Sequence, residues 1–207
     1  MGCEIETIVL RYRDLSSKNT IKIHNDKIAA KGFVWWGWWA KPQEKVALEV
    51  FKSLAEKAVS DTHFEVFLLD SGRSELRRAQ CIDIKFDFNN PIPSPQKNAT
   101  PAYYNKNEYL MWFKFDKISE PIDSPDKYIN NYSYVQVDEH FASKTSPFSV
   151  FNNKKVYNLN ELIEQQCTIW FLRKAKTDDE NRQIVSYAPG NGNVETSFSI
   201  ANTNQLL

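Results

Sequence analysis

The segment Phe33-Val34-Trp35-Trp36-Gly37-Trp38-Trp39 contains four of the chain's six tryptophans. Tryptophan has a large ring that either fills a core or offers a flat surface. Such a cluster indicates either an aromatic layer of the hydrophobic core or a surface on which a planar ligand stacks. The glycine within it is a second signal, because an ordinary buried strand has no need of a position without a side chain.

In an extended strand, successive side chains point to opposite faces of the sheet. This alternation predicts one face formed by Phe33, Trp35, Gly37 and Trp39, and another formed by Val34, Trp36 and Trp38. One face is expected to pack against a helix, and the other to be open to a ligand. Gly37 would leave a slot between two indoles in which a planar group lies against the backbone. The alternative is that Gly37 marks a bulge and that all four rings belong to the core.

Outward from this segment, the hydrophobic pattern predicts a mixture of helices and strands. Apolar residues at helical spacing make residues 45–60 the clearest helix, with the helix packing through Phe51 and Leu54. The other predicted helices are 20–31, with Thr20 as N-cap and Gly32 as the stop, and 160–166. The predicted strands besides the tryptophan segment are 5–13, 63–69, 75–85, 109–118, 132–137 and 168–173. Between the predicted strands 63–69 and 75–85, Asp70-Ser71-Gly72-Arg73 is typical of a hairpin turn.

Composition indicates a globular protein with its own core. The chain has 207 residues, of which 42% are hydrophobic and 14% aromatic, so that neither a disulfide nor a metal is needed for stability. The 26 basic residues balance the 26 acidic ones, which excludes a surface that is basic throughout. Binding of nucleic acid therefore requires a local patch. We expect one domain over residues 1–174 and a polar, weakly ordered extension or linker over residues 175–207.

Cysteine usage and the absence of long apolar runs predict a cytoplasmic location without a membrane anchor. Cys3, Cys81 and Cys167 are far apart and fit no ligand spacing, as expected of small apolar residues in a reducing compartment. No apolar segment approaches the roughly 20 residues that span a bilayer. The three histidines, His24, His63 and His140, have no metal-ligand spacing to acidic residues or cysteines. We therefore expect no metal and no cofactor.

The sequence contains no recognisable catalytic motif. It has six glycines, and none forms a phosphate-binding loop between a strand and a helix, nor a nucleophile elbow. Asp70, Ser71 and Arg73 combine an acid, a nucleophile and a cation, but these residues are also expected in a hairpin turn. The sequence therefore favours a binding domain over an enzyme.

A long loop over residues 86–107 is the second candidate for a functional segment. It contains four prolines and ends in Tyr103-Tyr104-Asn105. Loops of this length within a compact domain are usually functional or disordered, and the paired tyrosines favour function. Trp112, on the predicted outer face of the following strand beside Lys114, is a further stacking candidate. Asp70, Ser71, Ser94 and Asn105 could provide hydrogen bonds to a base.

The run from Phe64 to Ile118 contains four motifs in order. These are Phe-Glu-Val-Phe-Leu-Leu-Asp-Ser-Gly, Leu-Arg-Arg-Ala-Gln-Cys-Ile-Asp-Ile, Pro-Ile-Pro-Ser-Pro followed by the paired tyrosines, and Met-Trp-Phe-Lys-Phe-Asp-Lys-Ile. In this order they resemble the EVE and YTH branch of the PUA-like superfamily. The resemblance implies an α+β fold with a small twisted, mostly antiparallel β-barrel flanked by two or three helices. It also implies an aromatic cage for a modified base, with Trp35, Trp36, Ser71, Tyr103, Tyr104 and Trp112 as candidates.

We therefore expect a non-catalytic domain that recognises a planar ligand, most of all a modified nucleobase or nucleotide, free or within a nucleic acid. Trp39 joins the candidates from the alternation argument. Arg11, Arg13, Arg73, Arg77 and Arg78 could contact phosphate, or could simply be solvated residues on strand faces. The partner would be a nucleobase-containing ligand, and the domain could be the sensor of a fused or neighbouring effector enzyme in a bacterial signalling or defence system. The alternative is a protein interaction or oligomerisation module with an aromatic surface.

Overall fold

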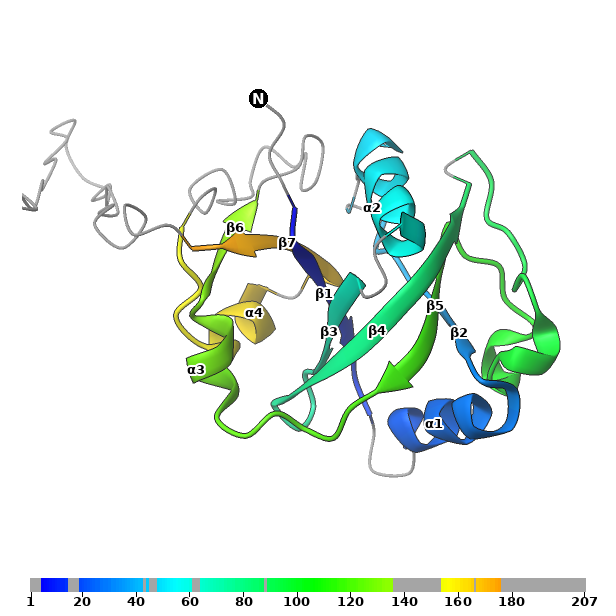
Figure 1. The fold of residues 1–207 in the computed structure, drawn as a ribbon, viewed down its shortest axis with the longest axis horizontal. Coiled ribbons are helices and arrows are strands. Elements are labelled where there is room, and N and C mark those ends of the chain that lie inside the picture. Colours follow the sequence, from blue (N-terminus) through cyan, green and yellow to red (C-terminus); the bar gives the residue numbers. More distant parts are fainter. Residues whose placement is uncertain are drawn as a thin grey trace, which may run out of the picture.

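Seven strands form one sheet in the structure, a computed structural model that describes residues 5–14, 19–42, 44, 48–60, 64–87, 89–135, 154–165 and 167–175. The strands are β1 (Thr7–Tyr12), β2 (Val34–Gly37), β3 (Phe64–Asp70), β4 (Glu75–Phe86), β5 (Met111–Ile118), β6 (Tyr132–Val135) and β7 (Ile169–Lys174) (Figure 1). The helices are α1 (Thr20–Lys31), α2 (Leu48–Ser60), α3 (Pro125–Ile129) and α4 (Leu159–Gln165), with short 3-10 helices η1 (Lys97–Ala99) and η2 (Ala102–Tyr104).

The strand order is β2-β5-β4-β3-β1-β7-β6. β1 and β3 are parallel, because two helices and a strand separate them along the chain, and the remaining neighbours are antiparallel. β3 and β4 form the hairpin that the sequence predicted. The Asp70 carboxylate accepts hydrogen bonds from the backbone amides of Gly72 and Arg73, at 2.8 and 3.3 Å, as expected of an Asx turn.

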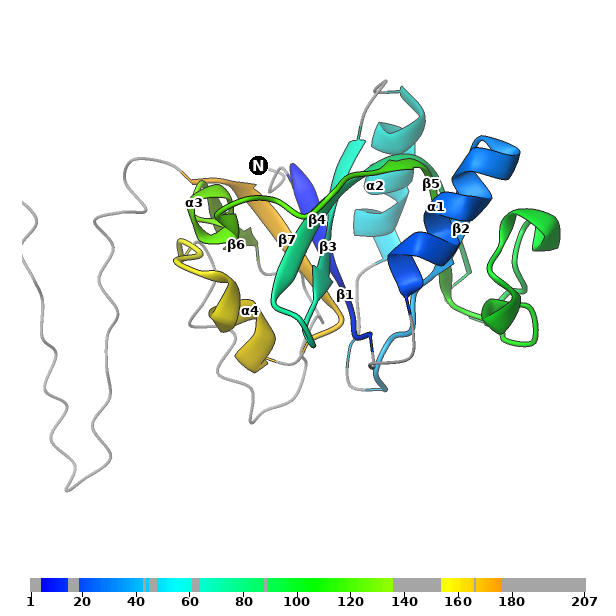
Figure 2. The ribbon, with the colours of Figure 1, turned by 90° about the horizontal axis from the view of Figure 1, so that it is seen from below.

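The sheet is covered on both faces. Figure 2 shows α1 and α2 on one side of the strands and α3 and α4 on the other. The larger core lies under α1 and α2 and contains Val66, Leu68 and Phe51, whereas the second core lies under α3 and α4 and contains Phe67 and Leu69. Consecutive residues of β3 therefore enter opposite cores, which explains why this strand is an almost unbroken apolar run.

The predicted barrel is wrong for the residues that the structure describes. The sheet stays open, since β2 and β6 form its two edges and do not pair with each other. The physical reason is the apolar content of both faces of the central strands, which requires a helical layer on each side and not one enclosed interior. The α+β class and the predominance of antiparallel pairing are as predicted.

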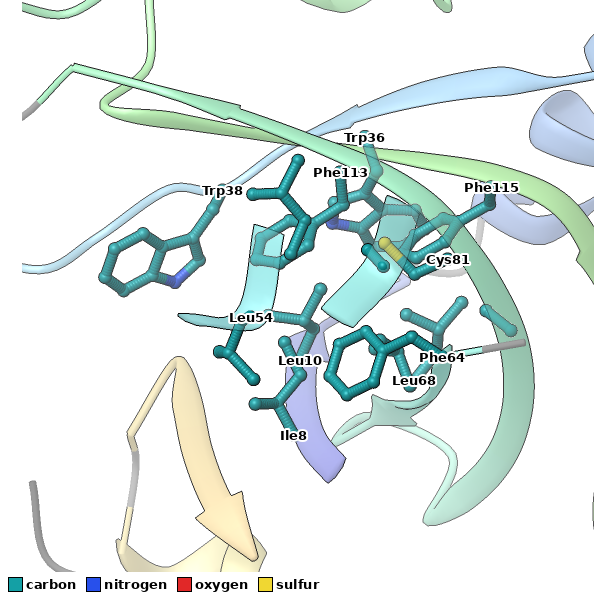
Figure 3. Close-up of a cluster of buried hydrophobic side chains, with 14 of the residues drawn as sticks. Ile8, Leu10, Trp36, Trp38, Leu54, Phe64, Leu68, Cys81, Phe113 and Phe115 are labelled. Carbon is teal, nitrogen blue, oxygen red and sulfur yellow. The ribbon is translucent and has the colours of Figure 1, made fainter. Parts of the chain in front are cut away.

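The larger core is strongly aromatic. Figure 3 shows Trp36, Phe113 and Phe115 together with apolar side chains of β1 and β3, and with Trp38 at one end of the cluster. Trp38 contacts Phe51 of α2, with ring centroids 5.9 Å apart. Trp36 and Trp38 thus lie in the same helix-covered core, in agreement with the prediction that they share a face.

Most local elements agree with their predictions. Helix α1 ends at Gly32, whose φ of 81° is the left-handed conformation that favours glycine, although the N-cap is Asn19 and not Thr20. The sequence did not predict α3. Among the described residues, no helix is both long and apolar enough to cross a membrane. Predictions for Cys3, His63, His140, residues 45–47 and 136–137, and the extension after Ala175 lie outside the described residues.

Candidate functional site

Trp36 is a core residue enclosed by other rings. Its indole lies 4.4 Å from the His24 imidazole, 5.5 Å from Tyr12 and 6.1 Å from Phe115, between ring centroids, and only 3% of the residue is exposed. This burial leaves no ring face on which a ligand could stack. The structure therefore places Trp36 in the core and outside any open pocket.

The opposite face of β2 is also covered, contrary to the prediction of an open face. Trp35 and Trp112 pack together on neighbouring strands and form a third apolar cluster with Ala99. The loop that follows β4 lies over them, and the Trp112 indole N–H donates to the carbonyl of Ile92 at 3.0 Å. The loop therefore buries two of the candidate stacking rings with its own side chains.

The slot predicted at Gly37 is filled by Tyr109. A Cβ atom at Gly37 would lie 2.7 Å from Cδ2 of the Tyr109 ring, closer than two carbon atoms can approach. Tyr109 in turn packs edge-on against Trp112 and Tyr104, with centroids 5.2 and 5.4 Å away. Glycine is needed here because a protein side chain, and not a ligand, lies against the backbone.

The predicted strand over residues 109–118 included Tyr109, and this part of the prediction is wrong. β5 begins at Met111, and Tyr109 instead forms an isolated bridge with Ile92 of the long loop. The bend at Leu110 breaks the two-residue period, so the Tyr109 ring lies on the side of Gly37 and Trp112.

Trp39 is the one exposed member of the tryptophan segment. β2 ends at Gly37, and 66% of Trp39 is exposed, whereas each of the other five tryptophans is at most 4% exposed. Trp39 lines an open pocket of about 570 Å³ together with Lys106, Asn107, Glu108 and Tyr109. This volume falls within the roughly 300–1,000 Å³ range of small-molecule sites.

The polar groups of this pocket offer both hydrogen-bond donors and acceptors. The Asn107 amide nitrogen donates to the Tyr109 hydroxyl at 3.3 Å and to the Tyr103 carbonyl at 3.4 Å, which leaves its amide oxygen to accept. Lys106 contributes a cation and Glu108 a carboxylate. Burial raises the pKa of Tyr109 although the hydrogen bond from Asn107 lowers it, so the phenol stays protonated at neutral pH. The pocket thus combines two rings with the polar groups that read a base edge.

The paired tyrosines connect this region to α1. Tyr103 and Tyr104 lie 4.5 Å apart between centroids, and both contact His24 edge-on, at 6.2 and 6.0 Å. Tyr103 is 44% exposed, whereas Tyr104 packs against the cluster of Trp35 and Trp112. Neither tyrosine lines the pocket with Trp39, so the structure does not assemble all the predicted cage residues around one cavity.

The remaining candidates lie elsewhere. The Ser71 hydroxyl donates to the carbonyl of Tyr12 at 3.2 Å, and a guanidinium nitrogen of Arg73 lies 4.0 Å from the Asp14 carboxylate. Arg11 donates to the carbonyl of Ile163 in α4 at 3.3 Å, and Arg13 is exposed at the end of β1. None of these four lines the pocket of Trp39. Sequence reasoning missed Lys106, Asn107, Glu108 and Tyr109, whose only signal was their place directly after the paired tyrosines.

His24 is fully buried with one nitrogen unpartnered in the structure. Its Nδ1–H donates to the carbonyl of Thr20 at 2.8 Å, and among the described residues Nε2 has no hydrogen-bond partner. Burial lowers the pKa of His24 to about 4, against weaker raising effects of the Thr20 carbonyl and of Asp14. The ring is therefore neutral throughout the neutral pH range.

Protonation of His24 is expected to destabilise the fold in acid. Because folding lowers the pKa of His24 from its ordinary value of 6.5 to about 4, the unfolded state binds more protons between these values. The contribution of His24 to the free energy of unfolding is thus fully present above pH 6.5 and is lost as the pH drops toward 4. At pH 5 the loss is about 2 kcal/mol. The check is urea unfolding at pH 7 and pH 5 for the parent and for His24→Asn, whose amide replaces Nδ1. A loss of equal size in the variant would assign the effect to other groups.

Comparison with known proteins adds one match. The model of a family described as Pua-like matches residues 8–183, which is most of the chain. Neither the curated proteins nor the solved structures yield a match.

Proposed function

The chain belongs to the Pua-like family, and from that membership we propose that it is a ligand-recognition domain whose binding surface is the pocket of Trp39 and Tyr109. Pua-like domains are typically non-catalytic and generally bind RNA or nucleotides. The proposed ligand is accordingly a nucleobase, free or as part of a nucleic acid. As part of this proposal, the chain is related to the EVE and YTH branch of the superfamily, and its pocket prefers a modified base.

The observation that carries the proposal is the exposed Trp39 beside a pocket. With 66% of Trp39 exposed at the edge of the pocket, its indole is available for stacking with a planar ligand. Stacking of a base on such a ring contributes about 1–3 kcal/mol. Asn107 and Glu108 can accept from amino groups of the base, and Lys106 can approach a phosphate.

Trp39→Ala is expected to weaken nucleoside or oligonucleotide binding about tenfold or more, because the stacking surface is lost. Calorimetric titration with nucleosides, nucleotides and short single-stranded oligonucleotides measures the effect. In the parent, tryptophan fluorescence should be quenched by the ligand, since Trp39 is the one indole in contact with water. Tyr157→Ala is the matched control, because Tyr157 is 49% exposed and does not line the pocket.

The titration also separates the alternative function. Equal affinities for the parent and Trp39→Ala would contradict the proposal. Flat titrations of the parent, together with a mass that grows with concentration and returns to the monomer value in Trp39→Ala, would instead assign the aromatic surface to protein association.

A further inference from the structure

A second pocket lies on the sheet, apart from the residues around Trp39. It has a volume of about 480 Å³ and is lined by Glu65, Arg78, Ala79, Gln80, Lys117 and Ser119. These residues come from three neighbouring strands and the turn after β5, and Arg78 lies on the face that carries α3 and α4, because it pairs with Phe67 of the second core. In the register, Glu65 pairs with Gln80, and Gln80 with Lys117, so the three side chains form a row across β3, β4 and β5.

Arg78 is held in place on this face. Its guanidinium lies over the Tyr128 ring of α3, 5.4 Å from the centroid, and donates to the Tyr128 hydroxyl at 3.1 Å. Tyr128 is itself fixed by an edge contact with Phe67, 5.9 Å away. A guanidinium held by a cation–π contact and a hydrogen bond loses less freedom when it binds an anion, and its planar donors match the oxygens of a phosphate.

The ion pair of Arg78 with Glu65 leaves the Arg78 guanidinium able to bind another anion. The closest nitrogen and oxygen are 3.8 Å apart, and both side chains are almost half exposed. Burial raises the pKa of Glu65 more than Arg78 lowers it, so the ion pair does not offset the desolvation of the carboxylate. A loose, solvated pair of this kind is weak and can be replaced by a better acceptor.

The backbone beside the pocket is also organised. The amide of Arg78 donates to the Ser119 hydroxyl at 3.0 Å, and the Ser119 amide donates to the carbonyl of Arg78 at 2.8 Å. Arg77 donates to the Ser119 carbonyl at 3.2 Å. The turn after β5 is therefore fastened to β4, and Lys117 is held on the same side as Arg78.

We propose that this second pocket binds the phosphate group of a ligand between Arg78 and Lys117. Phosphate fits better than a carboxylate, because it carries more charge near neutral pH and has enough oxygens to contact two cations at once. Glu65 limits the affinity, since an arriving anion must compete with its carboxylate for Arg78. The assignment does not depend on the proposed function of the Trp39 pocket, with which it shares no residue.

The test is titration of the full chain with inorganic phosphate at constant ionic strength, followed by amide chemical shifts. In the parent, the amide chemical shifts of residues 78–80 and 117–119 are expected to change as phosphate is added and to level off when the site is saturated. Arg78→Ala should weaken binding about tenfold, as expected for a lost charge-assisted hydrogen bond. Lys117→Ala should weaken it several-fold, whereas Glu65→Gln should strengthen it several-fold. Lys52→Ala, an exposed lysine on α2 outside this pocket, is the matched control.

The outcomes separate the possible sources of the anion. Acetate that shifts the same amides as strongly as phosphate would replace the assignment by a general oxyanion site. Nucleoside monophosphate that binds more tightly than phosphate, equally in the parent and in Trp39→Ala, would place a nucleotide in the second pocket. The proposal is overturned if the amide shifts of the parent do not change at tens of millimolar phosphate. It is also overturned if the parent and Lys117→Ala show equal shifts, because Lys117 is exposed and its substitution does not threaten folding. None of these results depends on whether Trp39 binds a base.

Discussion

Trp36→Ala is expected to lower the free energy of unfolding by about 3–5 kcal/mol, the cost of removing a fully packed large ring from a core. The indole touches side chains from three different elements: Tyr12 of β1, His24 of α1 and Phe115 of β5. Its loss leaves a cavity among them, which adds to the lost transfer free energy of the ring. Urea unfolding at pH 7, monitored by far-UV circular dichroism, measures the change.

Trp39→Ala is the control within the same segment. Because most of Trp39 is in water, its removal is expected to change stability by about 0.5 kcal/mol or less. The two variants therefore separate a ring that holds the fold from a ring available to a ligand. A Trp36→Ala protein as stable as the parent would place that indole outside the core and refute the packing described here.

Gly37→Ala is the second substitution with a large expected effect, about 1–3 kcal/mol of destabilisation, although the change adds a single methyl group. Alanine in a strand normally stabilises by about 0.4–1 kcal/mol, because it restricts the unfolded chain. Here the added carbon would lie 2.7 Å from Cδ2 of Tyr109, whose ring is confined by Tyr104 and Trp112. Overpacking is thus expected to outweigh the gain, as measured by the urea midpoint at pH 7.

A double-mutant cycle identifies the cause. Tyr109→Ala removes the ring from above Gly37, so Gly37→Ala in that background should be neutral or stabilising. An equal cost of Gly37→Ala in both backgrounds would show that strand geometry, and not the Tyr109 ring, requires the glycine. Since Tyr109 also lines the pocket with Trp39, Gly37→Ala should weaken ligand binding together with stability.

Much of the fold could be predicted from local patterns. The helix after Thr20 and the hairpin at Asp70 depend on neighbours within a few residues, and the structure agrees with both. The parallel pairing of β1 with β3 and the open sheet were not predicted, because pairing between segments more than fifty residues apart leaves no local periodicity. The resemblance supplied the Pua-like family, which the family match confirms, but its barrel was too specific.

The candidate site was predicted less well, for the same reason. Ser71, Arg11, Arg13 and Arg73 have the right chemistry but lie away from the pocket of Trp39. Lys106, Asn107 and Tyr109 were overlooked because they have no motif, and only the course of the loop between β4 and β5 brings them to Trp39. Arg78, one of five arginines that were equivalent in the sequence, is distinguished by its stacking on Tyr128 of a helix that was not predicted.

For the tryptophan segment, the sequence alone established which rings share a face, because the direction of a side chain follows from its parity in an extended strand. It did not establish which rings are covered. That depends on the loop carrying Ile92, Ala99 and Tyr109, which packs on Trp35 and Gly37 but leaves Trp39 66% exposed. The face on which a side chain lies follows from its odd or even position along the strand, which is a local property of the backbone. Burial depends on which other segments lie beside that side chain, so it arises only when distant segments pack together.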